Sequence, residues 1–377
     1  MSFARSISKT LVASLALTGL AACAEPLPEE GLIITPRLLA IKTEVTTPLP
    51  GTMEDPTLPS RAQALPLETV TITPWIVGPD GPIDPAELDP VWIACELSPG
   101  AGLFGCISAE FPVALADIPA CIEADFTQLS GGDLPETVTP CLIGRDFAPE
   151  YQVPLAGSVF AGGAIELTMV TGVGDGTPTD ECANILFSGE YELPDDCIYA
   201  VQRLSVGPLE QLFVLLEQFG VEIDGVDIPE VDEVPEADRN PRITKLEYAI
   251  LGEDGSEGAR TEVNSGDTIT AQLGQTIRVY TTSPEEDLQS YEIPVNNGAS
   301  TQTETEAYFA DWFRTWGTLL SGTSDDPESY NEWNLVQGSQ DELESPDADT
   351  AHLYYVLRDG RQGVNWWYLR VAVDPAG

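Results

Sequence analysis

The sequence predicts a mainly β protein made of two tandem β-rich domains. Short apolar or alternating segments recur along the chain, separated by Gly, Pro and Asn. The 377 residues include 33 glycines and 31 prolines, a content that favours many turns between short strands. An acidic, proline-containing stretch near residue 230 divides these segments into two groups.

The predicted strands are the segments whose apolar residues alternate or form short runs between turn residues. In chain order they are 38–45, 70–77, 91–97, 164–171, 198–206, 243–251, 276–282, 353–358 and 364–373. The last two are joined by a short, glycine-containing loop, Asp359 to Gly363, which predicts a hairpin.

One helix is predicted near 208–219. Pro208 lies in its first turn, Gly220 follows its end, and Leu212 and Leu216 recur at helical spacing. Its apolar stripe is more typical of a core face than of a partner-binding face.

The stretch 222–239 carries eight acidic residues up to Asp238 and no basic residue before that point, a composition typical of a solvated linker. The predicted organisation is therefore a signal peptide at 1–22, a tether at 23–32, a β-rich domain stapled by disulfides at 33–221, the linker at 222–239 and a β-sandwich domain at 240–377.

The N-terminus has the pattern of a secretion signal. Arg5 and Lys9 precede an apolar stretch at 11–19, and Leu20-Ala21-Ala22-Cys23 follows it. This resembles the signal of bacterial lipoproteins, in which the peptidase cuts before the cysteine, and it implies that Cys23 carries the lipid. With no Asp after Cys23, the resemblance favours the outer membrane, with the protein facing the periplasm or the exterior.

The chain is strongly acidic, with 62 acidic against 16 basic side chains and a net charge of −46. This charge excludes nucleic acid, and an anionic lipid surface bound through a basic patch, as partners. The partners that we expect are the membrane, through the lipid on Cys23, and an envelope protein or glycan.

Six further cysteines lie within one window of the N-terminal domain, and an even number in an exported chain predicts three disulfides. They are Cys95, Cys106, Cys121, Cys141, Cys182 and Cys197. Fifteen pairings exist, and sequence alone does not choose among them; the short loops suggest 95 with 106 and 182 with 197, which leaves 121 with 141. Because no C-x-x-C occurs and the only histidine is distant, zinc is not expected.

Two motifs carry a resemblance to a family. Pro36-Arg37 and Pro241-Arg242 each precede a strand that is followed about 35 residues later by another, and Arg358-Asp359-Gly360-Arg361-Gln362-Gly363-Val364-Asn365-Trp366 forms the closing hairpin. Together they resemble the Ig-like β-sandwich lipoproteins of Gram-negative bacteria. The resemblance implies an Ig-like sandwich for 240–377 and no particular activity. It also implies a strand for the aromatic segment near Trp312, although Phe309, Trp312, Phe313 and Trp316 fit helical spacing equally well.

No catalytic residue is predicted. A Ser-His-acid triad would need His352, which lies at the start of a strand, and no G-x-S-x-G elbow occurs. A hydrolase using paired carboxylates remains an alternative, although so many acids make any one pair uninformative.

Calcium is the one cofactor considered. Asp80, Asp84 and Asp89 lie in one predicted loop, and Asp175 and Asp180 lie in another. Carboxylates on loops suit Ca²⁺, but no EF-hand spacing occurs, so solvated surface charge is the favoured interpretation.

Aromatic residues gather in the second domain. Tyr330, Trp333 and Trp366 are candidates for a carbohydrate platform, with core packing as the favoured alternative. Adjacent Trp366 and Trp367 must point to opposite faces of their strand.

The sequence therefore predicts a secreted, lipid-anchored protein of the cell envelope that acts as a non-catalytic binding or structural module. A calcium-dependent or carbohydrate-binding adhesion module is the first alternative, and a hydrolase is the second.

Overall fold

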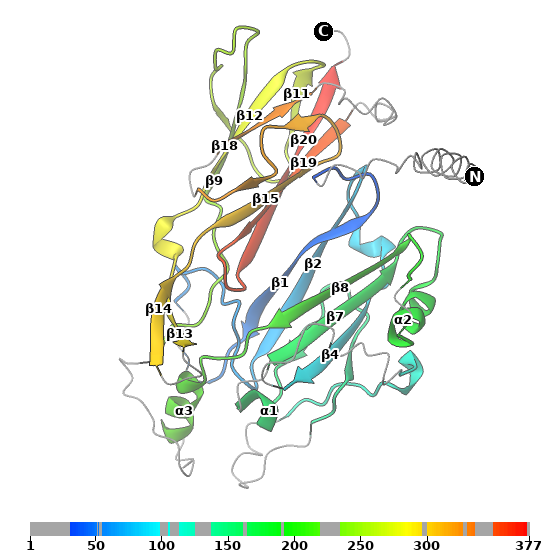
Figure 1. Cartoon of the computed structure of the whole chain (residues 1–377), viewed down its shortest axis with the longest axis vertical. Helices are drawn as coiled ribbons and strands as arrows, with labels where there is room; N and C mark the ends of the chain where they lie inside the picture. The colour runs from blue at the N-terminus through cyan, green and yellow to red at the C-terminus, as the bar shows by residue number, and fades with distance from the viewer. Residues whose placement is uncertain are drawn as a thin grey trace, which may run out of the picture.

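The structure is a computed structural model, and it describes residues 31–50, 52, 55–98, 105, 113–124, 137–160, 164–189, 192–218, 234–295, 300–326, 330–335 and 350–374. The described chain is mainly β, as predicted. It forms two units, and in Figure 1 the C-terminal unit lies above the N-terminal unit. The predicted signal peptide lies outside the described residues.

The N-terminal unit contains two antiparallel sheets. The first has the order β1 (Arg37–Thr47), β2 (Thr69–Gly78), β3 (Gly81–Pro82), and β6 (Glu150–Gln152) also pairs with β2. The second has the order β5 (Cys141–Gly144), β4 (Val91–Leu97), β7 (Ala164–Gly172), β8 (Cys197–Leu204). Ile72 and Ile76 of β2, Trp92 of β4 and Leu167 of β7 belong to one buried cluster, so the core lies between the sheets.

In the described part of this unit, three α-helices accompany the sheets: α1 (Gly157–Phe160), α2 (Thr179–Phe187) and α3 (Leu209–Gln218). The last confirms the helix predicted near 208–219, and its Leu212 and Leu216 are buried. No helix was predicted at the position of α2. Its Leu186 and Phe187 pack with Val91 and Ile93 of β4, so α2 covers the second sheet on the face away from the first.

The C-terminal unit is a β-sandwich of two five-stranded sheets. One has the order β10 (Thr261–Glu262), β9 (Lys245–Ile250), β12 (Thr276–Thr282), β18 (Tyr330–Asn334), β16 (Thr318–Leu319). The other has the order β11 (Thr268–Gln272), β20 (Val364–Asp374), β19 (Thr350–Arg358), β15 (Phe309–Arg314), β17 (Thr323–Ser324). A separate hairpin consists of β13 (Ser290–Val295) and β14 (Ser300–Thr305).

Aromatic side chains fill this sandwich. Trp312, Trp333, Tyr355 and Trp367 lie in one buried cluster, with ring centroids of Trp312 and Tyr355 only 4.6 Å apart. The segment that fitted both a helix and a strand is therefore a strand, β15, with Trp312 pointing into the core. The predicted hairpin is confirmed: β19 and β20 pair antiparallel from Thr350 opposite Ala372 down to Arg358 opposite Val364.

The two units share a hydrophobic core, which the sequence analysis did not predict. Trp75 of β2 stacks on Trp366 of β20 at 5.4 Å between ring centroids, and it meets Tyr354 of β19 edge to face at 5.6 Å. Leu39 of β1 and Val356 of β19 belong to the same buried cluster. In Figure 1 the hairpin β19–β20 reaches down from the upper unit to β1.

Two segments that lie at predicted boundaries contain buried residues. Leu32, placed in the tether, is buried, and its neighbour Ile33 donates a backbone hydrogen bond to the carbonyl of Arg314 in β15. Ala237 and Asp238, placed in the solvated linker, are also buried. Both segments pack against folded elements, and a boundary drawn from composition does not detect such packing. Residues 222–233 of the predicted linker lie outside the described residues.

Candidate functional site

The five aspartates considered as calcium ligands are all exposed, and the structure gives several of them other roles. Asp84 Oδ1 accepts a hydrogen bond from the backbone N–H of Ala86 and so caps a short 3₁₀ helix, Pro85–Glu87. Asp89 and Asp180 both pair with the guanidinium of Arg145. Among the described residues, no three of these aspartates form a group that could share a metal ion.

The three candidates for a carbohydrate platform do not form one. Trp333 is fully buried and its Nε1 donates to the carbonyl of Trp316 at 2.7 Å, so it cannot face a glycan. Trp366 is covered by Trp75 in the core between the units. Tyr330 is exposed, with the guanidinium of Arg278 4.9 Å from its ring centroid. The alternative interpretation, core packing, therefore holds for both tryptophans.

The cysteines follow the pairing that the short loops suggested, as far as the structure describes them. Cys121 is bonded to Cys141, and Cys182 to Cys197. Cys95 is also disulfide-bonded, whereas Cys106 and Cys23 lie outside the described residues. Since Cys182 belongs to α2 and Cys197 begins β8, this bond holds the helix to the sheet that it covers.

His352 is a buried residue of β19, stacked on Tyr354 with ring centroids 6.1 Å apart. Burial, reinforced by the charge of Arg370, lowers the pKa of His352 to about 4. The imidazole is therefore neutral at physiological pH, and its environment is that of a packed strand residue.

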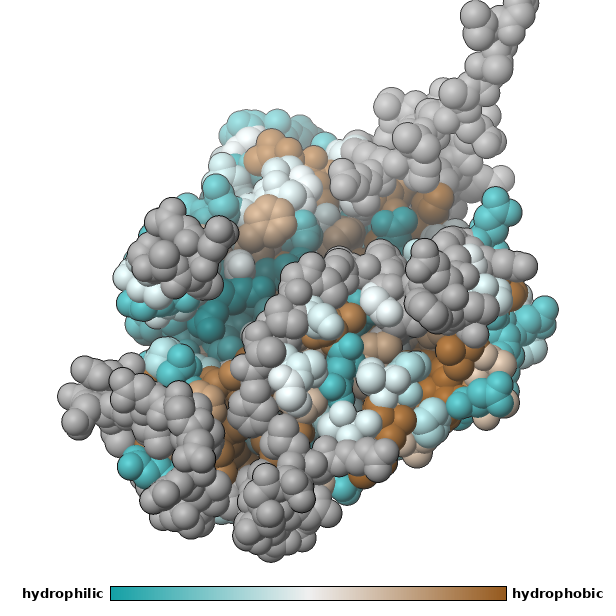
Figure 2. All heavy atoms as spheres, turned by 60° about the horizontal axis from the view of Figure 1, so that its bottom comes forward, coloured by the Kyte–Doolittle hydropathy of each residue, from teal (hydrophilic) through white to brown (hydrophobic). Residues whose placement is uncertain are grey.

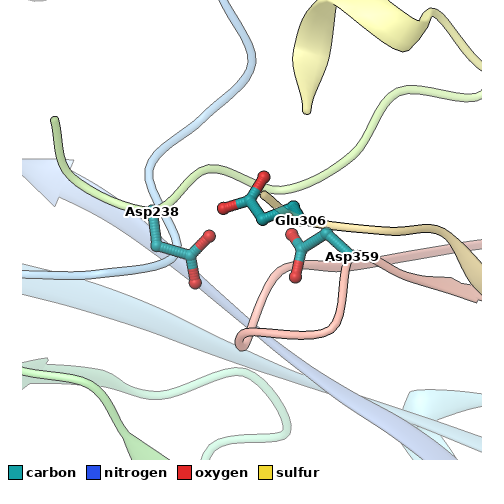
Figure 3. Close-up of side chains that lie close together, drawn as sticks. All are labelled: Asp238, Glu306 and Asp359. Atoms are coloured by element: carbon teal, nitrogen blue, oxygen red, sulfur yellow. The ribbon is translucent and has the colours of Figure 1, made fainter. Parts of the chain in front are cut away.

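The structure instead brings together three carboxylates that the sequence analysis did not combine: Asp238, Glu306 and Asp359. One oxygen atom from each lies within 4.8 Å of the others, and all three residues are buried. Figure 3 shows their carboxyl groups facing a common centre from three different chain segments. We call this group the seam cluster.

The first of these segments, which carries Asp238, is paired with the N-terminal unit. The backbone N–H groups of Ala62 and Gln63 both donate to the carbonyl of Asp238, and Asp238 N donates to the side-chain oxygen of Gln63 at 3.0 Å. Two residues later, Asn240 donates to the carbonyl of Thr43 in β1 at 2.8 Å. The same Asn240 accepts from Val364 N of β20 at 3.0 Å, so this segment connects both units.

The second and third segments belong to the C-terminal unit. Glu306 follows β14, and its Oε2 accepts from the backbone N–H of Gln289 at 2.8 Å. Asp359 opens the β19–β20 loop, and its Oδ1 accepts from the backbone N–H of Arg361 at 2.9 Å. Gly360 between them has a φ of 87°, a left-handed conformation that glycine adopts without strain.

Arg361 provides a counter-charge for the cluster. Its Nη1 lies 2.9 Å from Glu306 Oε1 and 3.9 Å from Asp238 Oδ1, while its Nη2 donates to Gln63 Oε1 at 3.2 Å. One guanidinium against three carboxylates leaves a formal charge of two negative units if all three carboxylates are ionised. Burying such charge is costly, so the cluster has to take up protons or a cation.

The pKa values of all three carboxyl groups are raised, which favours their protonated forms. Burial raises the pKa of Asp359 to about 8, and the charge of Asp238 adds to the shift. Burial also raises the pKa values of Asp238 and Glu306, against the lowering effect of Arg361 on both. Without a bound cation, the cluster therefore holds at least one proton at neutral pH.

A pH dependence of stability follows. A carboxyl group whose pKa is higher in the folded than in the unfolded chain binds its proton more tightly when folded, so the free energy of unfolding falls as pH rises from about 4 to about 8. One such group contributes at most about 1.4 kcal/mol per pH unit. Urea unfolding in chelator between pH 5 and 8 measures this fall. We expect Asp359→Asn to flatten it, and an unchanged slope in that variant would contradict the assignment.

A cleft of about 600 Å³ lies beside the seam cluster. It is lined by Leu38 to Ile41 of β1, Ala200 to Arg203 of β8, and Gly360 to Val364 of the hairpin, together with Phe309 and Arg358. Figure 2 shows the surface hollowed between two parts of the molecule. Asp238, Glu306 and Asp359 are not among the residues that line this cleft.

Two residues of this site lie in a motif that could be recognised from the sequence. Asp359 and Arg361 belong to the hairpin motif that carried the family resemblance, but Asp238 was assigned to a solvated linker and Glu306 was not singled out. These residues are far apart along the chain, and only the packing of the two units brings them together.

Comparisons with known proteins do not assign the chain to a family. No protein-family model and no curated protein matches it. Solved structures that were matched include the extracellular domain of the hybrid two component system BT3049 from B. thetaiotaomicron, at 12% identity over 83% of this chain, and dimeric latent PorU from Porphyromonas gingivalis, at 10% identity over 90%. This chain spans 38% and 34% of their lengths. Both TM-scores are 0.20, so neither structure indicates the fold or the function of this chain.

Proposed function

We propose that the protein is exported, anchored in the cell envelope by a lipid on Cys23, and used there as a non-catalytic structural or binding module. The observation that carries the proposal is the basic and apolar N-terminus that ends in Leu20-Ala21-Ala22-Cys23. Acyl chains on one N-terminal cysteine provide the strength that stable membrane anchoring requires. The outer membrane is the proposed membrane.

The disulfides support export. Such bonds persist in oxidising compartments and are rare in a reducing cytosol. In the described chain, Cys121–Cys141 and Cys182–Cys197 are formed, and Cys95 is bonded as well. No helix among the described residues is long and apolar enough to cross a membrane.

The packing of the two units supports a structural role. Aromatic contacts such as Trp75 on Trp366, and backbone pairing of the segment near Asp238 with residues 62 and 63, join the units over several segments. A body joined in this way holds its surfaces at fixed positions relative to each other, which suits a module displayed from a membrane.

Lipid anchoring is tested by replacing the acceptor residue. We expect Cys23→Ser to lose incorporation of radiolabelled palmitate, because a serine cannot form the thioether to the lipid. Intact mass spectrometry of the wild-type protein is expected to show an acylated N-terminus at Cys23. Ala24→Ser, which keeps the cysteine, serves as the control and should still incorporate the label. A Cys23→Ser protein that incorporates the label as the wild type does would overturn the proposal.

A further inference from the structure

The seam cluster has an unsatisfied ligand atom in addition to its charge. Asp359 is 2% exposed and its Oδ2 has no hydrogen-bond partner, while its Oδ1 accepts from Arg361 N. A buried carboxylate oxygen without a hydrogen-bond donor destabilises the fold, and it persists only where something else offsets that cost. Asp238, 1% exposed, likewise has an Oδ1 that accepts no hydrogen bond.

A backbone carbonyl lies close to the same place. If Gly363 had a Cβ, that atom would lie 1.8 Å from Asp359 Oδ2 and 2.4 Å from the carbonyl oxygen of Arg239. Both oxygens therefore lie on the open side of this glycine, where the Cβ of any other residue would clash with them. The site thus offers carboxylate and carbonyl oxygens from the segment at 238–240 and a carboxylate oxygen from the β19–β20 loop.

We propose that the seam cluster binds one calcium ion, held by Asp238, Glu306 and Asp359 with the carbonyl of Arg239 as a further ligand. Calcium takes oxygen ligands at about 2.3–2.6 Å, so two ligand atoms across the ion are separated by up to about 5 Å. The 4.8 Å spread of the three carboxylate oxygens matches this size. Magnesium, with ligands at about 2.0–2.1 Å in a strict octahedron, would require a tighter group.

The charge also matches. Three carboxylates and the Arg361 guanidinium leave two negative charges, which one divalent cation neutralises. Arg361 also lines the 600 Å³ cleft, so the loop that carries Asp359 borders that cleft. Bound there, the ion would connect the segment at 238–240 to the β19–β20 hairpin and to the residue that follows β14.

Calorimetric titration of the mature chain with CaCl₂ at pH 7 tests the proposal. We expect one site per chain in the wild-type protein, no site in Asp359→Asn, and an unchanged site in Asp89→Asn. Absence of binding, or binding that persists in Asp359→Asn, would overturn the proposal.

Thermal melts of matched variants provide the second measurement. At constant ionic strength, 10 mM calcium is expected to raise the melting temperature of the wild-type chain by roughly 2–5 °C over chelator, and magnesium by less. Asp359→Asn keeps the size of the side chain and should lose this rise. Asp89→Asn, at an exposed aspartate paired with Arg145, should keep it. A rise that persists in Asp359→Asn would place the ion elsewhere. Neither measurement depends on lipid anchoring at Cys23, so the two proposals can fail separately.

Discussion

Replacing Trp75 by alanine is expected to lower the free energy of unfolding by about 3–5 kcal/mol, the usual cost of removing a large buried aromatic side chain. Trp75 is 7% exposed and packs on Trp366 and Tyr354 of the other unit. The substitution therefore opens a cavity in the core that the units share. Urea unfolding, followed by tryptophan fluorescence and by circular dichroism, measures the loss.

In Trp75→Ala, the two units should also unfold in separate transitions. In the wild-type chain the two probes should report one transition, whereas a weakened shared core allows one unit to unfold before the other. Tyr330→Ala, which removes a 49% exposed aromatic side chain from β18, is the control and should cost less than about 1 kcal/mol. A loss for Trp75→Ala no larger than that of the control would show that the contact between the units contributes little.

Replacing Arg61 by methionine is expected to cost about 3–5 kcal/mol, because it leaves the buried carboxylate of Glu68 without its cation. The two side chains are 4% and 0% exposed, and they form a bidentate pair at 2.9 and 2.7 Å. Glu68 also accepts from the backbone N–H groups of Leu49 and Leu65. The carboxylate thus organises the chain between β1 and β2 as well as balancing the charge.

A double-mutant cycle separates these effects. Glu68→Gln keeps an oxygen acceptor for the backbone but removes the charge, so the double variant with Arg61→Met should be more stable than Arg61→Met alone. Equilibrium urea unfolding of the four proteins gives the coupling energy. If the changes in unfolding free energy caused by the two substitutions are simply additive, the Arg61–Glu68 ion pair does not stabilise the segment between β1 and β2.

The strands could be predicted from the sequence because their signal is local. The segments at 70–77 and 91–97 lie within β2 and β4, and Trp366 and Trp367 lie on opposite faces of β20 as period-two geometry requires. Trp367 faces the sandwich core and Trp366 faces the N-terminal unit. The pairing Cys182–Cys197 also followed from a local quantity, its short loop.

The seam cluster could not be predicted from the sequence, because it depends on which faces of the two units pack against each other. Composition assigned Asp238 to a solvated linker, yet pairing with residues 62 and 63 buries it. An acidic run contains no information about which of its members the fold will desolvate. The same limit applies to Trp333, which resembled a glycan platform by composition and is instead fully buried.

Differential scanning calorimetry of the mature chain tests most directly the central claim that the two β-sandwich units form one body. A shared aromatic core and a segment that pairs with both units require them to unfold together. We therefore predict a single endotherm whose calorimetric and van't Hoff enthalpies agree. Two resolved endotherms, or a calorimetric enthalpy about twice the van't Hoff value, would contradict the account and describe two independent domains.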